Sequence, residues 1–348
     1  QSSDRKLWTG TELGVTVYDG YSFTNYQYTV ANESIGRILC ITQDSLNGMW
    51  IGGDKGLFFV QGNAVKKVEL QSRTALAVEA LLTDAAGNVW AGDLNALYKI
   101  NRQHMEQVHK NYPAVIDLSP FAAFTKRVFS IAADNKHNIY IGSYDGIYKI
   151  AANANSYKTA WLNPDPAQAV RSVAAYSPDS IFWNCLDRHP MQMINGKITT
   201  GLTEAYIGRT VFISRNNAYA LTTSGVGLII NGIVKPVVLF GNTTNNAVTA
   251  LVDAEENIWV GSWEGLLKFR KTAFDQYTIK HDIHNEAFSF LEKKNGELLF
   301  GGNRGLVFTR KLDEIVADKT IPALFPLAEV MCMYEDGEGG IWAGSGYQ

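Results

Sequence analysis

A short phrase recurs along this chain at a nearly constant spacing. It reads "LWTGTELGV" from Leu7, "MWIGGDKGL" from Met49 and "IWVGSWEGL" from Ile258, and related copies begin at Val89, Ile139, Leu298 and Ile341. Each copy joins bulky apolar residues to a glycine two positions after an aromatic anchor, and most carry a second glycine four positions later. Self-similarity at a fixed period means that the chain stacks copies of one structural unit.

The spacing and content of the repeat predict its architecture. The anchors are Trp8, Trp50, Trp90, Tyr140, Phe182, Tyr219, Trp259, Leu299 and Trp342, with gaps of 37 to 43 residues and one of 50. A period near forty suits both four-stranded propeller blades and helical arrays. One unit divides into short runs at 37–44, 49–53, 56–62 and 64–70, rich in β-branched and aromatic residues and bounded by Gly, Asn or Asp. Such runs are strands, so we predict an all-β propeller of four-stranded antiparallel blades.

One column of the repeat indicates where the units pack most closely. Ten residues before seven of the anchors, in the first strand of a unit, stands a small residue: Cys40, Ala80, Ser130, Ser172, Thr249, Ser289 and Cys332. The first strand is innermost in a propeller, where neighbouring blades leave little space. The unit anchored at Tyr219 has Arg209 here, which predicts an irregular blade or a shifted register. Cys40, Cys185 and Cys332 are too few for a disulfide framework, and the two cysteines of the column are interpreted as small apolar fillers.

The number of blades is open between eight and seven. The sequence begins where the first strand of a unit would end, and it finishes with a first strand and a bare second strand. Pairing of the termini would close eight blades as a single domain over 1–348, which the repeat count favours. Alternatively, seven blades close and a second propeller starts near 300–348.

Composition and charge exclude several classes of function. The 348 residues are 46% hydrophobic and 19% charged, with a formal net charge of -3, so nothing favours binding to nucleic acid or to anionic membranes. No apolar run approaches the roughly 20 residues that cross a bilayer, so we expect membrane contact only through segments outside this sequence. An aspartate stands six residues before five of the anchors, at Asp44, Asp84, Asp134, Asp253 and Asp336. We expect these carboxylates to accept hydrogen bonds from turn amides.

The phrases "LWTGTELGVTVYDGYSFTNY", "MWIGGDKGLFFV" and "IWVGSWEGLLKF" resemble the two-component-regulator propeller repeat. The resemblance spans the chain and is weakest between about 160 and 240. It implies the periplasmic sensor region of a hybrid two-component receptor in the inner membrane, without enzymatic activity of its own, that detects oligosaccharides. In such receptors two seven-bladed propellers precede a β-sandwich, a membrane helix, a histidine kinase and a DNA-binding regulator. This chain has none of those later parts. The resemblance therefore implies other domains of the same receptor as partners, with homodimerisation as a further possibility.

The hairpin between the second and third strands of each unit carries the candidate ligand site. Its two central residues differ between repeats, and strand alternation places all these hairpins around one mouth of the central channel. Binding residues commonly lie in such loops. Trp263 and Tyr144 offer flat faces to a sugar ring, and Trp263 is the strongest candidate because an exposed tryptophan is unusual. The cations Lys55, Arg188 and Arg304 would bind carboxylate or sulfate groups, and the set is completed by Asp54, Glu264 and Asn303.

The longest insertion, His104 to Lys126, is predicted to join the fourth strand of one unit to the first strand of the next. That connection would bring it to the same mouth, where it would cover the channel, contact another domain or serve as an ordinary loop.

An enzyme remains an alternative at this stage. A sialidase-type box is not matched, because in "DAAGNVW" the aspartate precedes the glycine by three residues. His281 and His284 are three residues apart, a spacing that suits a metal on a helix, but neither a helix nor a third ligand is evident. No nucleophile elbow or paired-carboxylate motif occurs. We therefore predict no catalytic residue, metal or cofactor. Two alternatives to the sensor stay open. One is a polysaccharide lyase or glycoside hydrolase, and the other is a structural propeller with its ligand site in other domains.

Overall fold

The computed structural model describes residues 1–70, 77–110, 114–116, 120–123, 127–152, 160–161, 169–185, 191–200, 210–214, 217–222, 225–230, 233–239, 247–270, 288–302, 305, 307–311, 314–317 and 329–345. Within these ranges the chain forms nine β-sheets and one helix. Contacts divide the chain into two units, Gln1–Lys271 and Thr272–Gln348. The predicted all-β fold class is confirmed.

The first unit contains seven sheets, numbered here in chain order. Sheet 1 comprises β1 (Leu7–Thr11), β2 (Gly14–Tyr18) and β3 (Phe23–Tyr26). Sheet 2 comprises β4 (Ile38–Gln43), β5 (Met49–Gly53), β6 (Gly56–Gln61), β7 (Ala64–Leu70) and β11 (Ala114–Ile116). Sheet 3 comprises β8 (Val78–Thr83), β9 (Val89–Asp93), β10 (Ala96–Ile100) and β12 (Ala122–Ala123). Sheet 4 comprises β13 (Val128–Ala133), β14 (Ile139–Ser143), β15 (Gly146–Ile150) and β16 (Ala160–Trp161).

The remaining sheets follow the same order. Sheet 5 comprises β17 (Val170–Ser177), β18 (Ser180–Cys185), β19 (Met191–Ile194) and β20 (Lys197–Thr200). Sheet 6 comprises β21 (Thr210–Ser214), β22 (Asn217–Leu221), β23 (Gly225–Ile230) and β24 (Ile233–Leu239), and sheet 7 comprises β25 (Ala247–Val252), β26 (Ile258–Ser262) and β27 (Gly265–Phe269). The second unit has sheet 8, with β28 (Ser289–Glu292), β29 (Leu298–Gly301), β30 (Val307–Lys311) and β31 (Glu314–Ala317), and sheet 9, with β32 (Val330–Glu335) and β33 (Ile341–Ser345).

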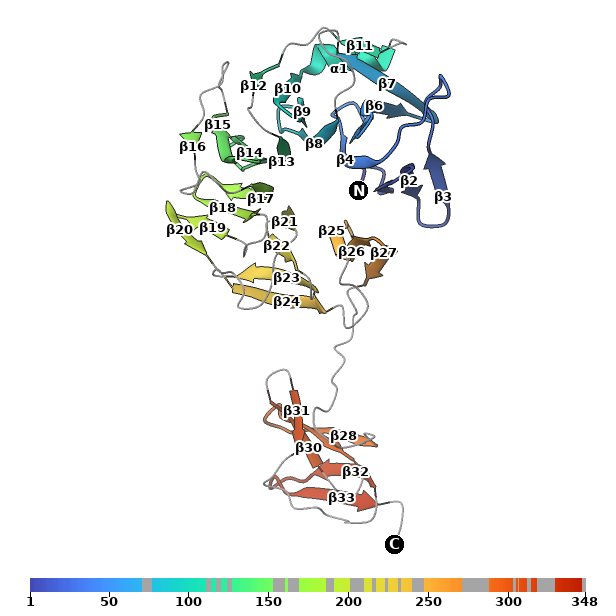
Figure 1. Cartoon of the computed structure of the whole chain (residues 1–348). Helices are drawn as coiled ribbons and strands as arrows, with labels where there is room; N and C mark the ends of the chain where they lie inside the picture. The colour runs from blue at the N-terminus through green and yellow to red at the C-terminus, as the bar shows by residue number, and fades with distance from the viewer. Residues whose placement is uncertain are drawn as a thin grey trace. The chain divides into compact units, whose positions relative to one another are not determined.

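The sheets of the first unit stand around a common centre, with their first strands innermost (Figure 1). Strands β4, β8, β13, β17, β21 and β25 contact one another in sequence. Sheet 1 has no such first strand and begins with the strand that carries the anchor Trp8. The core lies between the faces of neighbouring sheets, where the fully buried Trp50 of sheet 2 clusters with Val78 and Tyr98 of sheet 3. Radial packing of this kind lets each sheet bury both of its faces.

The column of small residues lies where the sheets approach most closely, as predicted. A Cβ atom added to Gly52 of β5 would lie 2.5 Å from Cys40 Sγ and 2.7 Å from Val78 Cγ1 of the next sheet. Sheet 6 keeps the column with a register shifted by one residue. Phe212 is paired with the anchor Tyr219, which leaves Thr210 at the small position. Its Oγ1 is 3.0 Å from Ser172 Oγ in sheet 5. Arg209 lies outside the described residues.

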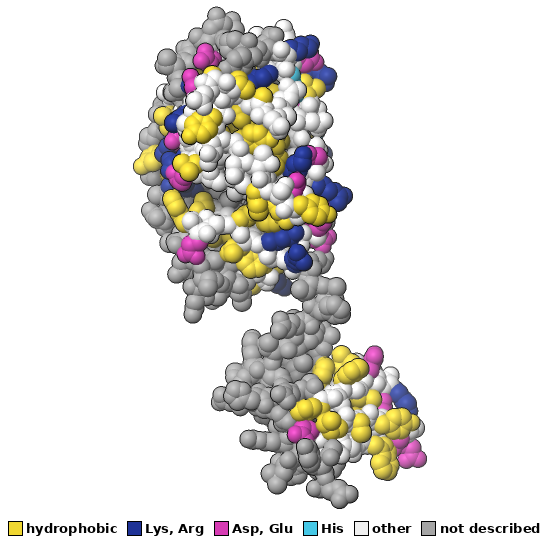
Figure 2. Space-filling model, turned by 90° about the vertical axis from the view of Figure 1, so that its right-hand side faces the viewer, with side chains coloured by type: hydrophobic (Ala, Val, Ile, Leu, Met, Phe, Trp, Pro, Cys, Tyr) yellow, Lys and Arg dark blue, Asp and Glu magenta, His cyan; other side chains and the backbone are white. Residues whose placement is uncertain are grey.

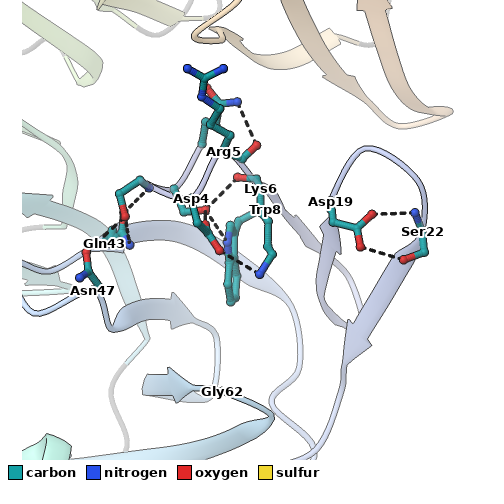
Figure 3. Close-up of polar contacts among 12 residues, drawn as sticks. Asp4, Arg5, Lys6, Trp8, Asp19, Ser22, Gln43, Asn47 and Gly62 are labelled. Atoms are coloured by element: carbon teal, nitrogen blue, oxygen red, sulfur yellow. Dashed lines mark hydrogen bonds and ion pairs between the residues drawn. The ribbon is translucent and has the colours of Figure 1, made fainter.

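The segment 1–6 contacts the neighbours of sheet 1 on both sides, and Figure 3 shows the side on which Gln43 and Asn47 lie. The amide of Ser3 donates to Gln43 Oε1 at 2.7 Å in sheet 2. On the other side, Arg5 Nη1 lies 3.0 Å from Glu255 Oε1 in sheet 7. The ring centres of Tyr18 in sheet 1 and Trp259 in sheet 7 also lie 6.1 Å apart. Sheets 1 and 7 therefore meet through side chains rather than through a shared strand.

The long insertion contains the helix α1 (Arg102–Lys110), which the sequence patterns did not predict. Asn101 caps it by accepting a hydrogen bond from the amide of His104 at 3.0 Å, and Met105 and Val108 are buried. The predicted position of the insertion is wrong. It begins directly after β10, the third strand of sheet 3, and β12 then pairs with β10 as the fourth strand. The insertion thus joins the third and fourth strands, a connection at the end opposite the predicted mouth.

Two changes in the repeat at sheet 2 make room for α1. Gly48 stands where sheets 3, 4 and 7 have asparagine, and Phe59 stands where the same three sheets have a lysine over the anchor aromatic. The ring of His109 packs 4.6 Å from the ring of Phe59. Its Nε2 lies 2.9 Å from Asp44 Oδ2, the carboxylate atom that asparagine reaches in other repeats. The insertion also adds β11 to the outer edge of sheet 2, parallel to β7.

Candidate functional site

The two ends of the first unit carry different kinds of turn. The Asp turns join the first and second strands, and in sheets 2, 3, 4 and 7 they contain Asp44, Asp84, Asp134 and Asp253. The mouth turns join the second and third strands, as at Thr11–Gly14 in sheet 1 and Ser262–Gly265 in sheet 7. Because strands alternate in direction, the two sets lie at opposite ends of the sheets.

The Asp turns have the structural role that the sequence predicts. Asp44 Oδ1 accepts hydrogen bonds from the amides of Leu46 and Gly48 at 2.9 and 2.8 Å. Its Oδ2 accepts a further bond from Nε1 of the anchor Trp50 at 2.8 Å. The spacing of six residues between aspartate and anchor was the available signal for this last contact. Equivalent bonds reach Trp90, Tyr140, Trp259 and Trp342.

Burial and hydrogen bonding perturb the ionisable groups of this scaffold. Burial acts to raise the pKa of Asp134, but hydrogen bonds from Asn138 and Tyr140 outweigh it and hold the pKa below its usual value. The pKa of Asp253 is lowered in the same way. Burial raises the pKa of the Cys40 thiol far above its usual value, so this thiol stays protonated and unreactive at neutral pH. In the described part of the chain, no group of His, Cys, Asp and Glu residues is placed to hold a metal ion.

The mouth turns are rigid frames that present two variable residues. Ser262 Oγ donates to the carbonyl of Gly265 at 3.1 Å and accepts from the amide of Glu264 at 3.2 Å. Asp93 closes the turn of sheet 3 by accepting from the amides of Asn95 and Ala96. Gly265 ends its turn at φ 135°, a conformation that disfavours side chains. The frame constrains the outer positions of each turn and leaves the central pair unconstrained.

Five of the predicted ligand-binding residues lie on described mouth turns of the first unit. The exposed fractions are 69% for Trp263 and 51% for Tyr144, and Asp54, Lys55 and Glu264 are also exposed. The other three candidates, Arg188, Asn303 and Arg304, lie outside the described residues. The geometry therefore gathers Asp54, Lys55, Tyr144, Trp263 and Glu264 at one end of the unit, and their role in binding stays a prediction.

The structure adds a second set of residues at the same end. In sheets 2, 3, 4, 5 and 7 the pairing between first and second strands skips one residue just before the small position. Each skipped residue is a β-bulge, a device that redirects a side chain and often lies beside a functional site. The bulge residues are Leu39, Glu79, Phe129, Arg171 and Val248. The signal for them was present in the sequence as the variable position next to the small column.

Charged and aromatic residues cluster where the bulges of sheets 3, 4 and 5 meet. Arg127 forms an ion pair with Glu79, whose side chain is only 10% exposed. The guanidinium carbons of Arg127 and Arg171 lie 5.7 and 5.1 Å from the centre of the Phe129 ring. The Tyr144 ring lies 6.4 Å from Phe129. The mouth thus joins turn and bulge residues of three sheets into one surface.

Hydrophobic residues are also exposed on the outer side of the first unit, away from the mouth turns. Tyr21 is 97% exposed and Phe23 is 62% exposed in and next to β3. Figure 2 shows hydrophobic side chains gathered on the side of the molecule where β3 lies, interspersed with charged ones. Those residues lie on an outer strand and lack the cross-sheet polar contacts of the bulge cluster, so the mouth is the better candidate site.

Comparison with known proteins identifies the fold. A family model described as a domain of unknown function, DUF5074, matches residues 32–178, less than half of the chain. No curated protein sequence matches the chain. The fold is similar to the extracellular domain of BT4673 from B. thetaiotaomicron, described both as a one component and as a hybrid two component system. The identity is 19%, the TM-score is 0.61, and the match covers 99% of this chain and 48% of that one.

The fold is also similar to virginiamycin B lyase from Staphylococcus aureus. That match has 13% identity and a TM-score of 0.60, and it covers 77% of this chain and 92% of the lyase. These likenesses show that the chain has the β-propeller fold. They agree with the resemblance of the repeat to sensor propellers. The chain spans about half the length of the BT4673 domain. No helix in the described part of the chain is long and apolar enough to cross a membrane.

Proposed function

We propose that this chain is the ligand-sensing propeller region of a periplasmic receptor of the hybrid two-component type. It binds an oligosaccharide at the mouth of the first unit and relays binding to a kinase outside this sequence. The observation that carries the proposal is the likeness in fold to the BT4673 extracellular domain over 99% of the chain. The repeat phrases, which resemble sensor propellers along the whole chain, support it independently.

The mouth supports a binding role because its scaffold is fixed while its exposed residues vary. Trp263 is 69% exposed on a hydrogen-bonded turn. An exposed tryptophan has few rotatable bonds and gives a large contact area at a low entropic cost. The seven sheets of the first unit stand around a common centre, which supports a mouth at one end of that unit. We infer that residues 1–271 form one propeller and that 272–348 begin a second one, in keeping with the division of contacts after Lys271.

Binding without turnover tests the proposal. The purified chain is titrated with neutral and acidic oligosaccharides by calorimetry, and each mixture is then analysed for products by chromatography. We expect binding with no product. Trp263→Ala should lower the affinity about tenfold, the loss of roughly 1.4 kcal/mol that a stacked aromatic ring supplies. Tyr21→Ala, which removes another exposed aromatic from the outer side, is the matched control and should leave the affinity unchanged. Equal affinity of wild type and Trp263→Ala would remove the mouth as the site.

A lyase is the second candidate function, because a lyase shares the fold at a TM-score of 0.60. In that case product would accumulate with time, and Glu264→Gln or another single carboxylate substitution at the mouth would abolish it. Failure of every oligosaccharide to bind would instead favour a structural propeller whose ligand site involves other domains.

A further inference from the structure

We propose that Arg171, held against Phe129, recognises an acidic group of the ligand, so that the sensed oligosaccharide carries carboxylate or sulfate. This inference rests on the proposed function and adds to it the chemical class of the ligand. It also places the site on the first strands as well as on the mouth turns.

The bulges bring the two residues together from different sheets. Phe129 is the bulge residue of β13 and Arg171 is that of β17. In a regular strand, alternation would direct each of these side chains to one face of its own sheet. The bulge changes that direction. With it, the guanidinium carbon of Arg171 lies 5.1 Å from the centre of the Phe129 ring. Such a contact orients the planar guanidinium while leaving its N–H groups available for a ligand.

The charges nearby leave Arg171 as the uncompensated cation. Arg127 is neutralised by Glu79, whose side chain is 10% exposed. Arg37 at the edge of sheet 2 lies 3.9 Å from Glu12 on the mouth turn of sheet 1. Arg171 is exposed, and no carboxylate among the described residues pairs with it. The cluster of Glu79, Arg127 and Arg171 therefore carries one net positive charge.

The shape of the cluster suits an acidic sugar better than a neutral one. Arginine binds carboxylate and sulfate through two parallel hydrogen bonds. The adjacent Tyr144 is 51% exposed and lies next to Phe129, so a sugar ring whose acidic group meets Arg171 would contact an aromatic surface. A neutral oligosaccharide would leave the Arg171 charge partly desolvated and unpaired, which is unfavourable.

The test uses the full chain and three probes: trigalacturonate, its uncharged trimethyl ester and a sulfated heparin tetrasaccharide. Calorimetry should show binding of at least one acidic probe, and the affinity should fall as the salt concentration rises. If trigalacturonate binds, its ester should bind at least tenfold more weakly. Arg171→Ala should weaken acidic binding at least tenfold, and Arg171→Lys should restore only part of it. Lys149→Ala is the matched control, because it removes a cation stacked 5.5 Å from Tyr140 in the same sheet as Phe129, and it should bind like wild type.

The outcomes separate this inference from the proposed function. Equal binding of the ester and trigalacturonate, or acidic binding that Arg171→Ala does not change, overturns the acidic site while leaving an oligosaccharide sensor intact. The acidic site is also overturned if none of these probes binds while neutral sugars bind in a way that depends on Trp263. No binding of any sugar overturns both. Thermal melting of each variant confirms that a lost affinity reflects the site rather than folding.

Discussion

The two ends of the first unit are built from the same strands but use their side chains differently. At the Asp turns, sheets 2, 3, 4 and 7 repeat one arrangement, in which a carboxylate accepts hydrogen bonds from the anchor aromatic of the second strand and from turn amides, two in sheets 2, 4 and 7 and one in sheet 3. At the mouth turns, a serine hydroxyl closes the turn in sheets 4 and 7, whereas sheet 2 has Gly53 at that position. The central pair changes from Asp54-Lys55 to Tyr144-Asp145 to Trp263-Glu264. A side chain repeated in every unit serves the scaffold, because every unit must satisfy the same turn.

This difference between the two ends indicates that residues at the Asp turns stabilise the fold, and it supports the proposal that residues at the mouth turns bind the ligand. Substitutions at the Asp turns should change the free energy of unfolding, and substitutions at the mouth should change binding alone.

The largest expected loss of stability comes from Asp44→Ala. Its carboxylate is fully buried and satisfies the amides of Leu46 and Gly48, the indole of Trp50 and the ring of His109. Removing it leaves several buried donors without partners, and each unsatisfied group costs about 1 to 3 kcal/mol. We expect a total loss of about 3 to 5 kcal/mol, measured by urea denaturation followed by tryptophan fluorescence.

Asp54→Ala is the matched control for this variant. Asp54 lies in the mouth turn of the same sheet and is exposed, so its removal should change the free energy of unfolding by less than about 0.5 kcal/mol. Comparable losses in the two variants would contradict the division between the two ends.

Gly52→Ala should be the next most damaging change. The added methyl group would meet Cys40 Sγ at 2.5 Å and Val78 Cγ1 at 2.7 Å. Forcing a methyl group into a packed core costs about 1 to 3 kcal/mol. A third contact would lie 2.9 Å away, at the carbonyl oxygen of Val78. The double variant Cys40→Gly/Gly52→Ala removes the closest of the three clashes and should recover part of the loss in the same denaturation experiment. No recovery would mean that the small column does not set the spacing between sheets.

The sequence predicted the features that each unit repeats. Small residues, anchors and Asp turns recur with the period, because each depends on contacts that several units make in the same way. Features that occur only once in the chain were harder to predict from the sequence. The insertion was placed at the wrong end because the fourth strand of sheet 3 is only the two residues Ala122–Ala123. The sequence shows that Gly48 and Phe59 differ from the residues at the same positions of sheets 3, 4 and 7. The reason for the difference is the packing of His109, which lies far along the chain.

The bulges show why the candidate site was only partly predicted. The mouth turns follow from strand alternation and are local in sequence. Phe129 and Arg171 instead belong to different sheets, and a one-residue change in pairing brings each of them to the mouth. A pattern within one strand cannot reveal a contact between side chains of two neighbouring sheets.

Asp134→Asn should lower stability by about 1.5 kcal/mol at neutral pH, the difference expected when hydrogen bonds to a charged acceptor become bonds to a neutral one. Because the pKa of Asp134 is lower in the folded chain than its usual value, the native state binds fewer protons. This contribution is therefore complete above about pH 4 and disappears as the pH falls through the folded pKa. Denaturation curves of the two proteins should converge on acidification below about pH 4. A constant difference down to pH 2 would contradict the assignment.

His109→Ala should destabilise the chain by about 1 kcal/mol, because one hydrogen bond to Asp44 and the packing against Phe59 are lost. The effect should be local, with faster hydrogen exchange in α1 and little change in sheets 4 to 7. Arg102→Ala, which removes only an exposed ion pair with Glu106 in the same helix, is the control and should leave exchange close to that of wild type. Equal exchange in both variants would mean that His109 does not fix the helix.

The smallest effect on stability is expected from Trp263→Ala, although it should have a large effect on binding. Trp263 is 69% exposed, and the turn that carries it is closed by Ser262 and Gly265 rather than by the indole. The variant should unfold within about 0.5 kcal/mol of the wild type. A stability loss near that of Asp44→Ala would mean that the Trp263 indole stabilises the fold. Binding and stability could then not be assigned to different ends of the unit. An unchanged unfolding curve with weakened binding would show that one end of each blade holds the ring together while the other is free to select the ligand.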